Sequence, residues 1–278
     1  GLAQSDLDIN IKADSIKLSG FGTQANKQIN LNGTVENSAT IYTKKGIKTK
    51  ALVNTGVIQA TNNIEVEGNV TNNGEILTNK NLTAKDTIST KKLIAKEGIS
   101  VNTLENAGII ATDNKLDVKG NLINRGEVQA MDTILVSGNV NNTGEIVTNH
   151  SFTAKDTIST KKLIAKDRIT TDKLENSGDI ATNKDLKVRS NLVNSGRIEV
   201  SANLFVKTDL ENKGNIITGE NLNAKTLTNR GGIQAVGKIS VTQNAKNTGK
   251  IVTNNTFTAK DTVTTKKLIA KEGISVDT

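Results

Sequence analysis

Residues 104–130 read LENAGIIATDNKLDVKGNLINRGEVQA, and this stretch decides the fold. Within it the phrase Leu-x-Asn-x-Gly begins at Leu104 and returns at Leu122, 18 residues later. The Asn spacing continues, with few changes, at the following positions: Asn106, Asn124, Asn142, Asn176, Asn194, Asn212, Asn229 and Asn247. A short fixed period is typical of a solenoid, in which each repeat forms one coil stacked on the coil before it.

The repeating positions of this stretch are all even-numbered, as in Leu116-x-Val118 and Leu122-x-Asn124. Because side chains on a strand alternate faces with period 2, an even repeat lets one parity point inward on coil after coil. We therefore predict an all-β fold, a parallel β-solenoid with coils of about 18 residues. Its predicted inward residues are Leu104, Ile110, Leu116, Val118, Leu122, Val128, Ile134, Val136, Val140 and Ile146.

A longer repeat overlies the first. Residues 83–96 (TAKDTISTKKLIAK) recur identically at 153–166 and almost identically at 258–271. In these copies Thr90, Thr160 and Thr265 stand where the period expects Asn, and the coil that follows Thr90 or Thr160 is two residues shorter. Since strand-like alternation continues through each copy, we interpret these segments as variant coils and not as linkers.

No composition shift marks a domain boundary, so we predict that residues 1–278 form a single β-helical repeat array. Residues 1–28 keep the alternation but lose the regular spacing, which predicts less regular coils there. The last residues, 266–278, repeat 91–103 closely and then stop. We therefore expect the chain to be a fragment of a longer protein.

The composition suits a narrow core of stacked aliphatic residues. The chain has no Pro, Cys or Trp, one Tyr and four Phe, from which a compact globular core is not easily built. Burying each Leu, Ile or Val stabilises a fold by roughly 1.5–3 kcal/mol without aromatics. The absence of Cys excludes a disulfide scaffold and thiol chemistry. No apolar run is long enough for a transmembrane helix, so we expect no membrane span.

The Asn positions can be interpreted as structure or as a binding site. Inward Asn side chains on successive coils can stack amide on amide, each donating to the next, which satisfies buried polar groups. The Gly two residues later is expected to permit a tight bend. A binding site would require the amides to face a cleft, so we favour the structural interpretation.

Metal and catalytic patterns are weak. The Gly-Gly-x-Gly-x-Asp repeats of calcium-binding solenoids are missing, and Asp86, Asp156 and Asp261 are too far apart for the six to eight oxygens that Ca²⁺ prefers. The single His150 corresponds to Lys80 in another copy of the long repeat, so its position accepts any polar residue. β-Helical polysaccharide enzymes need carboxylates or Arg clustered in a groove. We predict no enzyme activity and no catalytic, cofactor-binding or metal-binding residues.

Charge is the remaining functional signal. The net charge is +8 with a pI near 9.4. Three lysine pairs share one phase of the coil: Lys91 and Lys92, Lys161 and Lys162, Lys266 and Lys267. These pairs are candidate contacts for an anionic glycan, although solubility and protection of strand edges would also explain them. Nucleic-acid binding usually adds aromatic residues to a basic stripe, so we expect no nucleic-acid partner.

The frame Leu-x-Asn-x-Gly-x-Val-x-Ala at 122–130, followed by Ile-x-Val-x-Gly at 134–138, resembles the repeats of filamentous haemagglutinin. That family comprises exoproteins of two-partner secretion and the related contact-dependent growth inhibition proteins. The resemblance extends from about Ile29 to the end. It implies a right-handed parallel β-helix, export through an outer-membrane transporter partner, and a secreted or cell-surface location in a Gram-negative bacterium.

Three functional hypotheses follow. The resemblance and the repeats favour a structural and adhesive shaft segment of a surface adhesin, whose receptor would be a host or bacterial surface molecule or glycan. The first alternative is the stalk of a contact-dependent growth inhibition protein that delivers a toxin. The second alternative is a polysaccharide-active β-helix enzyme, which would need a groove with clustered acids.

Overall fold

The computed structural model describes residues 3–20 and 22–277, and within them all regular structure is strand, with no helix. The contacts divide the chain into two compact units, residues 1–138 and 139–278, which we describe one at a time as unit 1 and unit 2. All printed strand pairings within each unit are parallel; examples are β12 with β14 in unit 1 and β23 with β25 in unit 2. The predicted all-β parallel solenoid is confirmed.

The strands of unit 1 are β1 (Ala3–Ser5), β2 (Ile9–Leu18), β3 (Thr23–Ala25), β4 (Ile29–Asn37), β5 (Thr40–Thr43), β6 (Ile47–Asn54), β7 (Val57–Ala60), β8 (Ile64–Val66), β9 (Val70–Asn72), β10 (Glu75–Thr78), β11 (Asn81–Ala95), β12 (Gly98–Thr112), β13 (Lys115–Val118), β14 (Leu122–Asn124), β15 (Glu127–Ala130) and β16 (Ile134–Val136). Those of unit 2 are β17 (Val140–Thr148), β18 (Phe152–Ala154), β19 (Thr157–Ala165), β20 (Ile169–Thr171), β21 (Lys173–Thr182), β22 (Leu186–Val188), β23 (Leu192–Asn194), β24 (Arg197–Val200), β25 (Leu204–Asn212), β26 (Asn215–Thr218), β27 (Leu222–Asn229), β28 (Gly232–Ala235), β29 (Ile239–Val241), β30 (Ala245–Thr253), β31 (Thr256–Ala259), β32 (Val263–Ala270) and β33 (Gly273–Val276).

Each coil presents three faces, which one coil of unit 2 illustrates. Strand β23 carries the inward Asn194 and belongs to the asparagine face, β24 belongs to the second face, and the start of β25 belongs to the third face. Every face pairs with the same face of the next coil, as Leu192 with Leu210 and Ile198 with Ile216. Long strands such as β25 continue around a corner from one face to the next.

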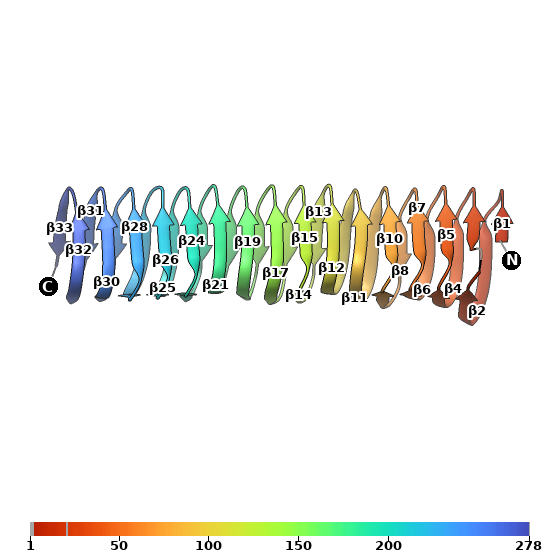
Figure 1. The fold of residues 1–278 in the computed structure, drawn as a ribbon, viewed down its shortest axis with the longest axis horizontal. Helices are drawn as coiled ribbons and strands as arrows, with labels where there is room; N and C mark the ends of the chain where they lie inside the picture. The colour runs from red at the N-terminus through yellow and green to blue at the C-terminus, as the bar shows by residue number, and fades with distance from the viewer. Residues whose placement is uncertain (1–2, 21, 278) are drawn as a thin grey trace. The chain divides into compact units, whose positions relative to one another are not determined.

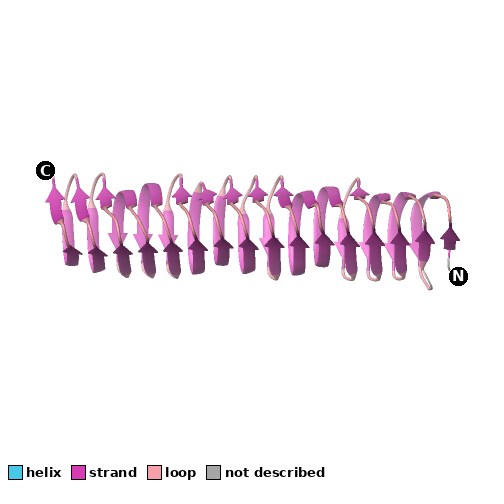
Figure 2. Cartoon of the chain, turned by 90° about the horizontal axis from the view of Figure 1, so that it is seen from above, coloured by secondary structure: helices cyan, strands magenta, loops and turns pink. Residues whose placement is uncertain are grey.

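The winding is right-handed, as the family resemblance implied. In each unit the strands nearer the viewer run upward and the faded strands behind them run downward, while the chain advances from the red toward the blue end (Figure 1). Seen from above, successive coils lie side by side with short connections between their strands (Figure 2).

The core of each unit is a stack of aliphatic columns. All ten inward residues predicted from residues 104–146 are buried, with at most 2% of their surface exposed. On the second face of unit 2, for example, Ile180, Ile198 and Ile216 stack on one another. The repeat 153–166 forms most of β18 and all of β19, so its interpretation as strand is confirmed.

The variant coils lose their residues at corners. In unit 2, Thr160 pairs with Asn176 but Lys162 pairs with Asp179, so the corner at Lys161 is one residue shorter than its successor. Unit 1 repeats this at Lys91. Because the missing residue lies at a corner where the long strand β19 or β11 passes from one face to the next, the inward alternation on either side of it is preserved. The first coil instead takes 20 residues, from Ile9 to its partner Ile29, and most of β2 is exposed.

Candidate functional site

The Asn side chains form a hydrogen-bonded ladder inside each unit. In unit 2, Asn176 Nδ2 donates to Asn194 Oδ1 at 2.8 Å, and Asn194 Nδ2 donates to Asn212 Oδ1 at 2.8 Å. The ladder continues through Asn229 and Asn247. These side chains are at most 3% exposed. They therefore hold successive coils together, as predicted, and their amides are turned away from any external ligand.

Threonine closes each run of the ladder in the variant coils. Asn72 Nδ2 donates to Thr90 Oγ1 at 2.9 Å, and Asn247 Nδ2 donates to Thr265 Oγ1 at the same distance. The same Asn72 amide donates to the carbonyl oxygen of Lys92 at 2.7 Å. A hydroxyl accepts as an amide oxygen does, so the prediction that Thr substitutes for Asn on these coils fits the geometry.

The glycine after each Asn has a different role from the one expected. None of these glycines has a positive φ, since within the described residues only Gly20, Gly22, Gly98 and Gly273 do. A Cβ placed on Gly214 would instead lie 1.9 Å from the carbonyl oxygen of Gly196 in the preceding coil. Glycine is thus required because adjacent backbones approach closely at this corner, and not because the chain bends tightly.

A further set of Asn residues, which the sequence analysis missed, bonds the other corners. Asn203 Oδ1 accepts the backbone N–H of Asn221 at 3.1 Å, and Asn221 Oδ1 accepts that of Lys238 at 2.8 Å. At another corner Asn69 Oδ1 accepts the N–H of Thr87 at 3.1 Å. Their signal in the sequence is an Asn directly before an inward Leu, Ile or Val, as in Asn191-Leu192.

The candidate lysines lie where the variant coils are shortened. Lys91 and Lys161 occupy the short corners and are exposed. Within unit 2, Lys162 and Lys267 lie in one outward column of the second face, through the successive partners Asp179, Arg197, Asn215, Gly232 and Lys250. The shared phase is therefore correct, but six coils, or about 29 Å, separate the two pairs of this unit. This exceeds a Debye length of about 8 Å, so the pairs act as separate spots.

The second lysine of two pairs is already engaged. Lys92 Nζ lies 2.6 Å from Glu75 Oε1, and Lys162 Nζ lies 2.8 Å from Glu145 Oε1. In the third pair Lys267 is the strand partner of Lys250, so a like charge replaces the acid. An anionic ligand would therefore meet Lys91 and Lys161 more readily than Lys92 and Lys162.

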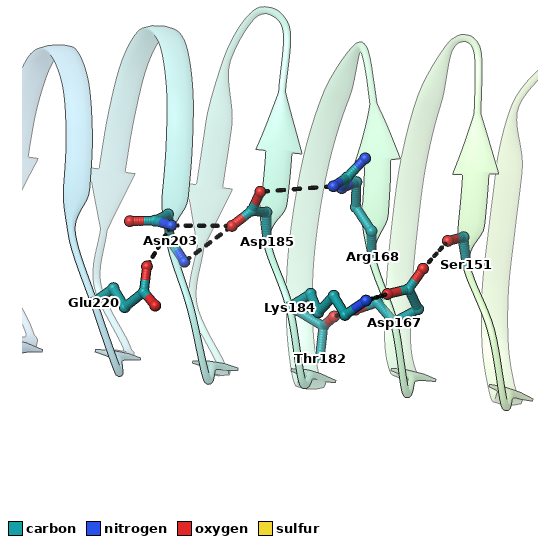
Figure 3. Close-up of polar contacts among 8 residues, drawn as sticks. All are labelled: Ser151, Asp167, Arg168, Thr182, Lys184, Asp185, Asn203 and Glu220. Atoms are coloured by element: carbon teal, nitrogen blue, oxygen red, sulfur yellow. Dashed lines mark hydrogen bonds and ion pairs between the residues drawn. The ribbon is translucent and has the colours of Figure 1, made fainter.

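A cluster of polar and ionisable side chains lies at the corner between the second and third faces of unit 2 (Figure 3). Asp167 Oδ1 lies 2.9 Å from Lys184 Nζ, and Ser151 Oγ donates to Asp167 Oδ2 at 2.8 Å. The Lys184 and Ser151 hydrogen bonds lower the pKa of Asp167. The stability these bonds contribute is present above the unfolded pKa of about 4 and is lost as the pH falls through the lower folded value.

This cluster is arranged for cohesion between coils. Asp185 Oδ1 accepts from the side-chain amide of Asn203 at 3.1 Å, and that amide also donates to Glu220 Oε2 at 2.6 Å. Each carboxylate comes from a different coil and binds a donor on a neighbouring coil (Figure 3). Both Ser151 and Lys184 bind Asp167, so Asp167 acts as an acceptor between them.

Three hollows of the surface lie on the third face of unit 1. Two of them, of about 330 and 360 Å³, share Lys48 and Glu65, whose charged atoms are 3.0 Å apart. Lys80 and Glu97 form a second ion pair in the larger hollow. Since these opposite charges bind each other, the hollows offer little net charge to a ligand.

Residues 3–20 and 22–277 contain no group of three or more His, Asp or Glu side chains placed to hold a metal ion. In the same part of the chain, we find no helix with the length and apolar character needed to cross a membrane. Comparisons with protein-family models, with curated proteins and with solved structures gave no match. The haemagglutinin resemblance therefore remains a prediction from the sequence.

Proposed function

We propose that this chain is a structural and adhesive shaft segment of a secreted bacterial surface exoprotein, and that it is not an enzyme. The observation that carries the proposal is the stacking itself. In unit 2 the Asn ladder, the aliphatic columns and the corner amides all bind one coil to the next, as at Asn194, Ile198 and Asn203. Because the coils are held together from inside, three outward faces remain available for contact. This suits a segment that lengthens a protein and exposes surfaces for binding.

The proposal includes the partners that the sequence resemblance implies. An outer-membrane transporter would export the chain, and a receptor or glycan on a host or bacterial surface would bind the whole protein. The exposed Lys91 and Lys161 support contact with an anionic glycan. A toxin-delivery stalk would use the same coils, so it is a variant of this proposal that depends on what the segment carries.

The test removes whole coils from the protein. Deleting residues 177–212 joins Asn176 to Lys213 and preserves the Asn-x-Gly spacing. We expect this variant to be exported and to support adherence to cells, because a shaft tolerates shortening by complete coils. The control deletion of 177–203 joins Asn176 to Leu204 out of phase and should abolish export.

Two outcomes would contradict the proposal. Failure of the in-phase variant to be exported, as expected of the out-of-phase control, would show that the coils are not interchangeable units of a shaft. Turnover of a polysaccharide by the unaltered protein would show that the protein is an enzyme.

A further inference from the structure

The second face of unit 2 carries outward columns whose pattern is self-complementary. Along four consecutive coils, the first outward residues are Glu145, Lys162, Asp179 and Arg197, which alternate in charge. The strand pairing places them in one column, one per coil. Reversing the order of this column gives the opposite charge at every position.

A parallel column of mainly apolar residues runs beside the charges. Its members on the same four coils are Val147, Ile164, Ala181 and Glu199. Val147, Ile164 and Ala181 point outward and are only partly buried. We call these eight residues the second-face patch. Apolar side chains on an outward face of a sheet are candidates for contact with another protein surface.

We propose that the second-face patch binds the same patch of a second copy of this chain, with the two units antiparallel. A two-fold axis that lies in the plane of the interface, parallel to the strands and perpendicular to the coil axis, keeps each column opposite itself but reverses its order. Lys162 then faces Asp179 of the second copy, and Glu145 faces Arg197. Ile164 packs against the small Ala181, so the apolar centre is complementary in size.

The same four coils show why charges decide this pairing. Lys162 already lies 2.8 Å from Glu145, and Arg197 lies 2.6 Å from Glu199. A parallel arrangement would need a two-fold axis along the coil axis. Such an axis sets the charged column either against the mainly apolar column or against itself with like charges opposed, and both are unfavourable. The antiparallel arrangement instead extends each intrachain pair into an alternating network.

The patch is small, so the association is weak. Four strands of four residues cover roughly 13 by 19 Å, or about 250 Å², well below the 800 Å² per partner of a standard interface. We expect a monomer–dimer equilibrium that appears at high protein concentration and weakens with salt. The proposal concerns contact between copies and does not depend on the proposed function.

The test exchanges charges between two variants of the full chain. Lys162→Asp places two acids opposite each other in the homodimer, and Asp179→Lys places two lysines opposite each other. Each variant alone should raise the dissociation constant at least tenfold, measured by sedimentation velocity over a concentration series. An equimolar mixture should recover dimers, because the introduced aspartate of one variant then faces the introduced lysine of the other.

The matched control is Lys92→Asp in unit 1, which lies in the same local sequence and also pairs with a glutamate. Its second-face partner in the next coil is Ile109, so the charge alternation is interrupted and the substitution should leave the equilibrium unchanged. Circular dichroism checks that all variants keep their strands. An unaltered protein that stays monomeric, a mixture without recovered dimers, or an equal effect of Lys92→Asp would each overturn the proposal.

Discussion

At the scale of single residues, the Asn side chain is well matched to its place because it both accepts and donates. Asn194 Oδ1 accepts from Asn176, and its amide nitrogen has three oxygens within reach: those of Asn212, Gly196 and Asn215, at 2.8, 3.0 and 3.2 Å. A carboxylate has the same shape but cannot donate. Shape alone is therefore not enough at this position.

We predict that Asn194→Asp lowers the free energy of unfolding by about 1–3 kcal/mol, since the carboxylate oxygen that replaces Nδ2 would face three acceptors and no donor. Burial raises the pKa of the new carboxyl above its unfolded value. The penalty should therefore be smallest below the unfolded pKa and grow as the pH rises through the folded pKa. Urea unfolding at several pH values measures it. The exposed Asn141→Asp is the control, and equal losses for both variants would reject the ladder as a source of stability.

The glycine of the Asn-x-Gly phrase gives a second prediction. Gly214→Ala should cost about 1–3 kcal/mol, because its Cβ would collide with a backbone oxygen that cannot move without separating two coils. Gly232→Ala provides a close comparison, since its nearest neighbour is the side-chain oxygen of Asn215, which can rotate away. Thermal unfolding should show a clearly lower midpoint for Gly214→Ala; similar midpoints would mean that the backbones have room.

At the scale of strands and corners, the position of a length change matters more than its size. Lys161 lies within β19 at the corner between two faces and does not belong to the inward alternation, whereas β24 (Arg197–Val200) has Ile198 inward and Glu199 outward. One extra residue inside a strand reverses every side chain after it until the next corner.

We predict that inserting one Gly after Lys161 is tolerated, since it restores the spacing seen from Asn176 to Asp179. One Gly inserted after Ile198 should cost at least about 2 kcal/mol more, because Glu199 would turn toward the core. Chemical unfolding of the two variants gives the comparison. A greater loss from the corner insertion would argue against the assigned register.

The sequence predicted the strands well because the alternation of inward and outward residues can be read directly from it, as the inward residues from Leu104 to Ile146 show. The corners were predicted less well. Asn203 and Asn221 form hydrogen bonds between coils, but they lie at corners, where inward and outward residues do not alternate. The repeat period alone therefore gave no reason to select them. The ion pair between Lys92 and Glu75 depends on the register between two coils. The position of the shortened corner sets that register, and the sequence alone did not give this position.

At the scale of the whole molecule, the surface is basic but its lysines are not equivalent. The net charge of +8 includes lysines such as Lys162 that are neutralised by a neighbouring glutamate. Lys91 and Lys161 sit at corners, ahead of those paired lysines. The candidate contacts for an anionic ligand are thus fewer than a count of lysine pairs suggests.

We predict that Lys91→Glu and Lys161→Glu together weaken binding to a heparin-like polymer, by up to about 1 kcal/mol for each lysine at low salt. The control for net charge is reversal of the charge at Lys119 and Lys225, which are exposed and lie on other parts of the coils. Affinity chromatography at two salt concentrations measures the effect. Binding that persists in both the variant and high salt would rule out these corner lysines.

The Asn ladder also gives the coils an electrical direction. Every amide in it donates toward the carboxyl-terminal side, from Asn176 through Asn247, so the side-chain dipoles add along the coil axis. Strand dipoles largely cancel in a sheet, and aligned hydrogen bonds polarise one another. A folded coil therefore offers amide hydrogens to the coil that follows it. When coils are added in sequence order, each finished coil is a donor template for the next, and the Thr hydroxyls at positions 90 and 265 end a run by accepting.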